Sequence, residues 1–468
     1  MGYAARRLAS LLVAIAMTAA VATAQHTDKL FIRGAKIVPV VGDVIEKGNV
    51  LIENGKIVAM GADVASPFDA RVVEAEGKVV IPGYVESMTA RGLDVSNENV
   101  PVAPFLQVFD AIDPSDEYFE EALRNGITSI HVSQAENAVV TGVSRVVRPL
   151  GLSVEEMTVV PDGGLKICFA PRRGADHAVQ LADLRGAFRE MDRYLEDLAE
   201  KLYEEDLEKK GEKVKVSPKE AREAGKKLVT VDKIDEKYRN LYRIREGSLD
   251  VYVWCQRAMD VHAALAFAKE QGLGERMTMV LGSETYKAVK LLKGLSRPVI
   301  LPIDSFVHRE IDRMTQEEKD TFVPSVLAEN KIPFAVAGLG EPWFDAAQLV
   351  RNGMTPAAAL EAITILPARA IGLDHRLGSL EVGKEGNLLI LTGDPMDTMT
   401  WVDMAVIEGR LVYERAKDKR LRHLIQGIFD TRMDESRKAA AAKKDGEPKK
   451  DDGAKKDGSA PAGDEKKN

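Results

Sequence analysis

Short apolar runs alternate with polar segments along most of the chain, which predicts a mixture of strands and helices. Near the amino terminus, apolar runs at 49–52 and 56–60 flank an Asn-Gly pair at 54–55. Such a pair between two such runs predicts a β-hairpin, because both turn residues must tolerate a positive φ. Near the other end, 387–391 and 402–412 show the same short β pattern, and we expect both ends of the chain to supply strands of one sheet.

Between these ends, predicted strands alternate with predicted helices. The strand-like runs are 126–132, 164–170, 251–255, 278–281, 298–302 and 333–337. Helices are expected at 115–125, 258–271 and 285–292, with an amphipathic helix pair at 354–372. Ser115 is the expected N-cap of its helix, because acidic residues occupy the first turn after it. Alternation of this kind over so long a stretch predicts a parallel barrel.

Two stretches break this alternation. Residues 190–246 are rich in Glu, Lys and Arg, with Leu195, Leu198 and Leu202 at helical spacing. This pattern predicts a charged helical insertion over the barrel mouth, and the alternative is a solvated decoration with no role there. Residues 429–468 are mostly Lys, Ala, Asp and Gly, and this low complexity predicts a disordered tail.

The first 24 residues have the pattern of a secretory signal. Arg6 and Arg7 precede an apolar stretch at 8–21, and the small residues at 22–24 form a cleavage site. We therefore expect an exported, periplasmic protein with no membrane span after cleavage. The alternative is an uncleaved anchor, which the short apolar stretch disfavours.

Composition narrows the classes of function. With 468 residues and 45% hydrophobic content, the chain is long enough for a barrel-sized domain and a smaller one. A net charge of -8 argues against a nucleic-acid partner. The two cysteines, Cys168 and Cys255, form no CxxC pair and cannot make a disulfide scaffold. The seven histidines show no HxH or HExxH spacing, although a binuclear metallohydrolase uses several histidines.

The stretch 78–94 carries the clearest family pattern. A buried apolar run ends in a Pro-Gly step at 82–83, which an apolar pair and the acidic Glu86 follow. This stretch resembles the first barrel strand of the amidohydrolase superfamily. The segments 354–372 and 377–384 are similar to that family's last barrel helices and to its return into a β-sandwich. Within the superfamily, the resemblance is to the periplasmic imidazolonepropionase-like, amidohydrolase-related group.

The resemblance implies an α/β fold in which a distorted (β/α)8 TIM-like barrel accompanies a composite β-sandwich built from both chain ends. The implied order along the chain is a signal peptide at 1–24, a first sandwich segment at 25–82, the barrel at 83–376 with an insertion at about 190–246, a second sandwich segment at 377–428 and the tail at 429–468.

The resemblance also implies zinc or another divalent metal at the carboxyl ends of the barrel strands, where a metal-bound hydroxide would attack a C–N bond. In this chain the family's ligand positions carry side chains that bind such ions poorly or not at all. They are Met88, Ala90, Trp254, Gln256, Leu281 and Gly340. A glutamate that the family pattern places before Pro171 is also missing. We therefore expect neither a metal nor another cofactor at the barrel mouth.

Other side chains have the chemistry for a replacement site. Glu284 and Glu341 follow strand ends near the mouth and are candidates for an acid or a base, and the alternative is that they hold loop backbone. Asp304, His308 and Asp312 lie four apart, a spacing that predicts one helix face. Such a trio binds a metal weakly, and the alternative is a solvated face.

Three further polar side chains lie within apolar strands. His131 in such a strand is typical of a hydrogen-bonded core histidine. Cys168 and Cys255 fall on strands that we expect to be neighbours, and a catalytic thiol would need a histidine that the sequence does not place beside either one.

These observations leave two main classes of function open. The first is a non-catalytic protein that binds a small ligand, forms a homo-oligomer or joins an active amidohydrolase relative. The alternative is an active hydrolase with an atypical site, acting on non-peptide C–N bonds of cyclic amides, amides or dipeptides. A purely structural role is a third reading, because a fold alone does not determine function.

Overall fold

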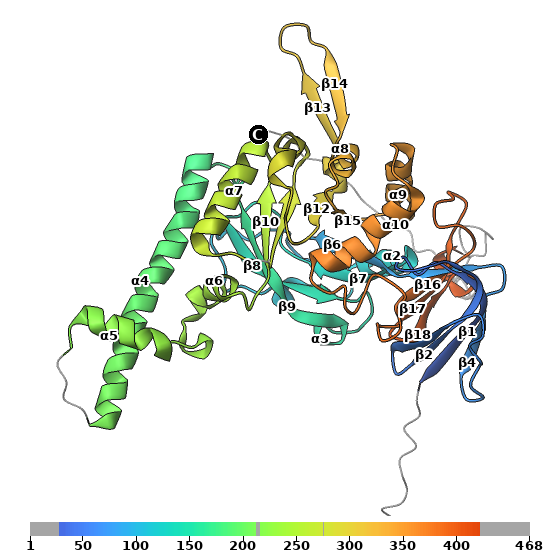
Figure 1. The fold of residues 1–468 in the computed structure, drawn as a ribbon, viewed down its shortest axis with the longest axis horizontal. Coiled ribbons are helices and arrows are strands. Elements are labelled where there is room, and N and C mark those ends of the chain that lie inside the picture. Colours follow the sequence, from blue (N-terminus) through green and yellow to red (C-terminus); the bar gives the residue numbers. More distant parts are fainter. Residues whose placement is uncertain (1–27, 212–215, 275, 422–468) are drawn as a thin grey trace, which may run out of the picture. The chain divides into compact units, whose positions relative to one another are not determined.

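The computed structural model describes residues 28–421, apart from 212–215 and 275 (Figure 1). The expected signal peptide at 1–24 and tail at 429–468 lie outside the described residues. The chain divides into a unit that ends at Arg415 and a second that begins at Ala416, and the sheets of the fold belong to the first. No helix within the described part of the chain is both long and apolar enough to cross a bilayer.

Strands from both ends of the chain form one sheet, as the sequence predicts. Its order is β18-β17-β16-β5-β1-β2-β3, with β4 also paired to β1. The strands are β1 (Lys29–Ile37), β2 (Ile45–Glu53), β3 (Lys56–Gly61), β4 (Arg71–Glu74), β5 (Val79–Pro82), β16 (Leu388–Leu391), β17 (Val402–Ile407) and β18 (Arg410–Glu414). The antiparallel pairing of β16 with β5 places Leu389 opposite Ile81 and joins the two chain ends. Between β2 and β3, Asn54 and Gly55 have φ angles of 50° and 79°, which confirms the predicted turn.

The Pro-Gly step marks the passage from this sheet into the barrel. β5 ends at Pro82, and β6 (Tyr84–Thr89) begins the second sheet after the single residue Gly83. A Cβ atom on Gly83 would lie 2.2 Å from Oγ1 of Thr128 on the neighbouring strand. A side chain at this position therefore has no room, which explains the glycine.

The second sheet forms the barrel wall, in the order β15-β12-β11-β10-β9-β8-β7-β6. Its other strands are β7 (Ile127–Val132), β8 (Val140–Val147), β9 (Thr158–Cys168), β10 (Val251–Cys255), β11 (Met277–Leu281), β12 (Val299–Pro302) and β15 (Phe334–Ala337). Neighbouring strands are parallel except at β8, which is antiparallel to both β7 and β9. The sequence pattern did not predict β8. The connection 133–139 is too short for the crossover that a parallel neighbour requires, so the chain turns back on itself.

Side chains of β6 bridge the seam between the first and last barrel strands. β6 and β15 are the two ends of the sheet order, and no backbone ladder joins them in the described residues. Ser87 Oγ donates a hydrogen bond to the Val336 carbonyl at 2.9 Å. The Glu86 carboxylate accepts the backbone N–H groups of Gly338 at 3.0 Å and Leu339 at 2.6 Å. The acidic residue of the family pattern therefore helps to close the barrel.

Helices accompany the barrel strands (Figure 1). They are α2 (Glu117–Arg124), α3 (Val154–Met157), α4 (His177–Lys210), α5 (Pro218–Gly225), α6 (Glu236–Glu246), α7 (Ala258–Gln271), α8 (Val323–Glu329), α9 (Pro342–Arg351), α10 (Pro356–Ile363) and α11 (Ile365–Ala370). α7 has the predicted bounds, and α10 and α11 form the predicted pair. The prediction that Ser115 caps α2 is wrong: Asp116 accepts the Tyr118 N–H at 2.8 Å, whereas the Ser115 hydroxyl donates to Asp113.

The charged insertion begins earlier than expected. α4 starts at His177 rather than near 190, and it continues for 34 residues. α5 packs so closely on α4 that a Cβ atom on Gly225 would lie 1.9 Å from the Ala199 carbonyl oxygen. Arg222 of α5 also forms ion pairs with three carboxylates of α4. The insertion is thus a helical layer with its own packing.

Candidate functional site

A cavity of about 230 Å³ lies at the carboxyl ends of the barrel strands. Side chains from β6, β9, β10, β11, β12 and β15 and from the loop after β7 meet there, as expected for the functional end of a barrel. The lining residues are Met88, Thr89, Ala90, Ser133, Gln134, Ala135, Glu136, Lys166, Trp254, Val280, Pro302, Asp304, Ala337 and Gly338. None of them belongs to the charged insertion, so the described residues of that insertion do not line this cavity.

The structure brings together only some residues of the predicted site. Met88, Ala90 and Trp254 line the cavity, whereas Gln256, Leu281 and Gly340 do not. Leu281 is fully buried in the apolar core. Those three positions therefore do not line this cavity.

The two candidate acids also lie away from this cavity. Glu341 lines a separate pocket of about 310 Å³, together with Gly340 and Tyr118. Glu284 belongs to the 3-10 helix η4 (Ser283–Leu291) and lines neither space. The structure thus does not join Glu284 and Glu341 in one site, and a catalytic role for either stays a prediction.

The trio Asp304, His308 and Asp312 does not share a helix face, and that prediction is wrong. Asp304 belongs to a short 3-10 turn, and His308 lies in β13 (Val307–Ile311), which pairs with β14 (Glu318–Phe322). Among the residues that the structure describes, these three side chains do not form a group that could hold a metal ion.

Lys166 of β9 is a lining residue that was not predicted from the sequence. Its side chain is 4% exposed although it carries an amine. The Nζ atom donates a hydrogen bond to the Gln134 carbonyl oxygen, and within the described residues no carboxylate forms an ion pair with it. Burial lowers the pKa of this amine, while the nearby Cys168 and Glu136 act in the opposite direction. The position of this lysine inside the apolar run 165–169 is the signal that could have pointed to it.

The remaining polar groups of the cavity are neutral inside and acidic at the rim. Ser133 and Gln134 are buried, and the Gln134 side-chain oxygen accepts the Gly142 N–H at 2.8 Å. Glu136 and Asp304 are exposed. The cavity thus combines one buried amine with two solvated carboxylates at its edge.

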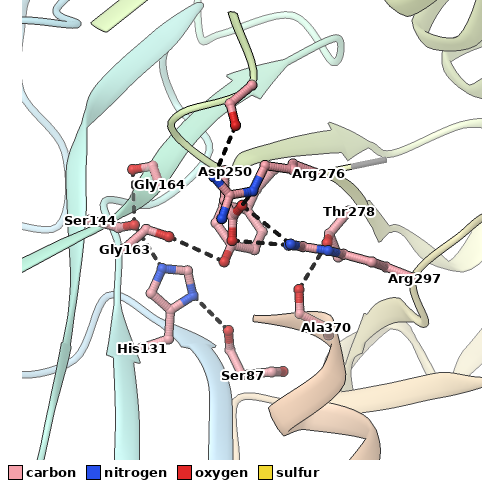
Figure 2. Close-up of polar contacts among 12 residues, drawn as sticks. Ser87, His131, Ser144, Gly163, Gly164, Asp250, Arg276, Thr278, Arg297 and Ala370 are labelled. Atoms are coloured by element: carbon pink, nitrogen blue, oxygen red, sulfur yellow. Dashed lines mark hydrogen bonds and ion pairs between the residues drawn. The ribbon is translucent and has the colours of Figure 1, made fainter. Parts of the chain in front are cut away.

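His131 lies in a buried network outside the cavity (Figure 2). Its Nδ1 atom is 2.8 Å from the Ser87 carbonyl oxygen, and its Nε2 atom is 2.7 Å from Ser144 Oγ. Burial lowers the pKa of His131 to about 4, so the ring is neutral at pH 7. Nδ1–H then donates to the Ser87 carbonyl oxygen, which leaves Nε2 as an acceptor. The single proton of the Ser144 hydroxyl is shared between this Nε2 and the Gly164 carbonyl oxygen, which lies 2.9 Å from Ser144 Oγ. This arrangement confirms the predicted hydrogen-bonded core histidine.

Asp250 lies in a cluster of ion pairs and does not line the cavity. Asp250 accepts two hydrogen bonds from Arg297, at 3.0 and 3.2 Å, and pairs with Arg276 at 2.9 Å (Figure 2). It precedes β10, at the opposite end of that strand from the cavity.

Cys168 and Cys255 lie on neighbouring strands as predicted, and burial raises the pKa of both thiols, which makes them poor nucleophiles.

Comparison with known proteins links these features to a family. The amidohydrolase family matches residues 260–412. An imidazolonepropionase of Thermoplasma volcanium is 24% identical over 418 residues, which cover 81% of this chain and 94% of that protein. An imidazolonepropionase of Geobacillus sp. is 26% identical over 383 residues, which cover 74% of this chain and 84% of that protein.

One solved structure has the same fold. An amidohydrolase from Thermotoga maritima has a TM-score of 0.69 and 23% identity, covering 82% of this chain and 100% of its own. This likeness confirms the expected TIM-like barrel architecture. An adenosine deaminase from Xanthomonas campestris, described with bound zinc, has a TM-score of 0.45 and 17% identity over 89% of this chain and 97% of its own.

The family match contradicts the expectation that the chain takes no cofactor. The matched family is the one whose pattern implies a divalent metal, so that expectation is wrong. The side chains of this barrel mouth nevertheless do not fit such an ion. Between residues 28 and 421, leaving out 212–215 and 275, no three His, Cys, Asp or Glu side chains cluster as a metal site. The metal dependence of the family and the side chains at this mouth therefore disagree.

Proposed function

Because the chain belongs to the amidohydrolase superfamily of hydrolases, we propose that its barrel mouth binds a small organic ligand without hydrolysing it. One observation carries this proposal: the mouth holds a cavity of about 230 Å³, yet the family positions that face it carry Met88, Ala90 and Trp254. An open cavity supports binding. Thioether, methyl and indole groups supply no base and no ligand for a hard or borderline ion.

The buried portion of the cavity adds to this support. Met88, Trp254 and Val280 offer apolar surface, while Lys166 and the hydroxyl groups of Thr89 and Ser133 offer polar contacts. An apolar lining with a few placed polar groups is typical of small-molecule sites.

The test measures binding and turnover on the same samples. Purified protein is titrated with a panel of cyclic amides, amides and dipeptides, with zinc or manganese supplied, and each mixture is then followed by NMR. We expect saturable binding of at least one compound, with no signals of a hydrolysis product appearing in its NMR spectrum over time. Turnover of any compound would refute the proposal, and loss of that turnover on adding a chelator would assign it to a bound metal.

A cavity-filling variant shows whether binding occurs at the mouth. Ala135→Trp places a large side chain on the lining loop and is expected to abolish binding. Ala70→Trp, on a half-exposed loop of the composite sheet, is the matched control and is expected to bind normally. Equal loss of binding in both variants would contradict binding at the mouth.

The second candidate function is hydrolysis of non-peptide C–N bonds. The resemblance to the imidazolonepropionase of T. volcanium over 81% of this chain favours it. The residues of the mouth do not fit a metal, so this function would need a hydrolytic step that uses other groups. The turnover arm of the experiment decides between this function and binding alone.

Export and assembly also belong to the proposal. The arginines, apolar stretch and small residues of positions 1–24 support a periplasmic location, which fractionation and amino-terminal sequencing of the mature protein test. A full-length cytoplasmic protein would refute it. We also propose a homo-oligomer or a complex with an active amidohydrolase relative, and a clean monomer by light scattering, with no co-purifying relative, would refute that.

A further inference from the structure

We infer that the ligand of the barrel-mouth cavity is a small organic monocarboxylate, and that its carboxylate pairs with the ammonium group of Lys166. This inference rests on the proposed binding function and names the chemical class of the ligand. It begins from the state of Lys166 in the described chain, where the amine is buried without a charged partner.

The hydrogen bonds of Lys166 leave most of its donors available. An ammonium group carries three N–H donors, and the structure gives one acceptor, the Gln134 carbonyl oxygen. A buried charge without a partner is costly, so buried ammonium groups in proteins are normally paired. A ligand carboxylate within the cavity would supply both the missing charge and acceptors for the free donors.

The location of the amine explains why a ligand, rather than the chain, would supply that charge. Lys166 lines the cavity, and it is the one basic side chain among its described lining residues. The acids nearest to it in the lining, Glu136 and Asp304, are exposed at the rim and make no ion pair with it. The amine is thus held within the cavity wall, where a carboxylate that enters the cavity can pair with it and stabilise its ammonium form.

The same residues limit what that molecule can be. The exposed carboxylates of Glu136 and Asp304 repel a second negative charge, which disfavours dianions such as phosphate. Met88, Trp254 and Val280 favour an apolar or aromatic body. A volume of about 230 Å³ equals that of roughly eight waters at ~30 Å³ each, which suits a compact molecule and excludes a polymer.

The test compares acids with their own amides, which have nearly the same shape and no charge. The probes are 5-oxoproline, N-acetylglycine and benzoic acid. Each acid is compared with its primary amide, and inorganic phosphate and chloride are tested as competitors. Affinities are measured by calorimetry on the full chain. We expect at least one acid to bind about tenfold or more tightly than its amide, and phosphate and chloride not to compete with it.

The variants assign the preference to Lys166. Lys166→Met keeps much of the side-chain volume without the charge, and it is expected to abolish the preference for the acid while the amide binds as before. Lys166→Arg is expected to retain some of the preference. Lys269→Met, at an exposed position of α7, is the matched control and is expected to behave as wild type. Lys166→Met removes a buried amine that has no charged partner, so its melting temperature is expected to equal or exceed that of wild type. A measured value in this range would show that the variant is folded.

Several results would overturn the inference. They are equal binding of acids and amides, an acid preference that persists in Lys166→Met, displacement of the acid by phosphate or chloride, and no binding by any of the three acids. A covalent adduct of Lys166 with a probe would overturn it as well. Equal binding of acid and amide leaves the proposed binding function standing, whereas no compound of the wider panel binding at all removes that function too.

Discussion

Glu86→Gln removes a carboxylate from the seam between β6 and β15 while keeping one of its two acceptor oxygens. In the wild type, Oε1 accepts the N–H groups of Met88 and Gly338, both at 3.0 Å, and Oε2 accepts that of Leu339 at 2.6 Å. A glutamine can keep its oxygen at the Oε1 position, but its NH2 group then faces the Leu339 N–H. One buried donor loses its acceptor, at a cost of about 1–3 kcal/mol.

The charge acts in the opposite direction. Burial raises the pKa of Glu86 from 4.5 to about 8, despite three backbone donors that favour the carboxylate. A carboxyl group with a raised pKa contributes stability below pH 4.5, and this stability is lost as the pH rises to about 8. At about 1.4 kcal/mol per pH unit, the wild type loses about 5 kcal/mol over this interval. Glutamine does not titrate, so the variant avoids this loss.

The two effects predict a difference in stability that changes sign. Near pH 4.5 the variant is expected to be less stable than wild type by the cost of one hydrogen bond, about 1–3 kcal/mol. Near pH 8 it is expected to be more stable by about 2–4 kcal/mol, with the crossover at a pH between about 5 and 7. Asp345, whose pKa burial raises to about 7, repels Glu86 but titrates in both proteins. Its own contribution therefore largely cancels in the comparison.

The assay is urea denaturation of both proteins at pH 5, 6, 7 and 8, followed by tryptophan fluorescence. The matched control is Glu46→Gln, whose wild-type carboxylate is 77% exposed and pairs with Lys36 at the surface. Its difference from wild type is expected to stay within about 0.5 kcal/mol across this range. If Glu86→Gln is instead less stable by a constant amount at every pH, then Glu86 is ionised throughout and the reasoning from its burial is refuted.

Three further predictions concern the rest of the fold. Asp250→Asn weakens a charge cluster whose carboxylate is 12% exposed, and we expect the free energy of unfolding to fall by about 3–5 kcal/mol in urea denaturation, whereas no change would contradict a structural role. Gly225→Ala places a methyl group against the backbone of α4, and we expect a melting temperature several degrees lower, whereas an unchanged value would show that α5 moves freely. Cys168 and Cys255 are fully buried with raised pKa values, so we expect both thiols to react with a disulfide reagent only after unfolding, and rapid labelling of the native protein would refute this.

Much of the fold was predictable because its signals are local. The bounds of α7 and β10 follow from apolar runs whose length and periodicity appear within a single segment. The Asn-Gly turn was predictable because the two residues themselves permit a positive φ. β8 was missed, since the direction of a strand depends on how the short connection before it can turn.

A prediction from residue spacing alone was wrong where a helix and a strand can show the same spacing. Asp304, His308 and Asp312 are four apart, which suits a helix face, but pairing with β14 makes the segment around His308 a strand. The energy of that pairing comes from residues further along the chain, so no window around the trio contains it.

The residues of the candidate site were also predictable only in part. The positions of Met88, Ala90 and Trp254 followed from a family pattern in their own strands, and these residues do line the cavity. Lys166 was missed, because a lysine within an apolar run reveals neither which way its side chain points nor what it meets. Glu341, which follows β15, lines a separate pocket together with Tyr118 of α2, and no local pattern could show that contact.

The amino-acid sequence by itself determined most of the strands and helices, the junction at Gly83 and the absence of histidine pairs, because each of these depends on neighbouring residues. Only the tertiary structure decided that Glu86 closes the barrel, since its backbone donors Gly338 and Leu339 lie 252 and 253 residues further along the chain. It also decided that Lys166 faces a cavity without a charged partner. The physical reason is that a side chain's burial, pKa and partners are set by atoms that folding brings together, whereas local propensity depends only on residues that are already adjacent.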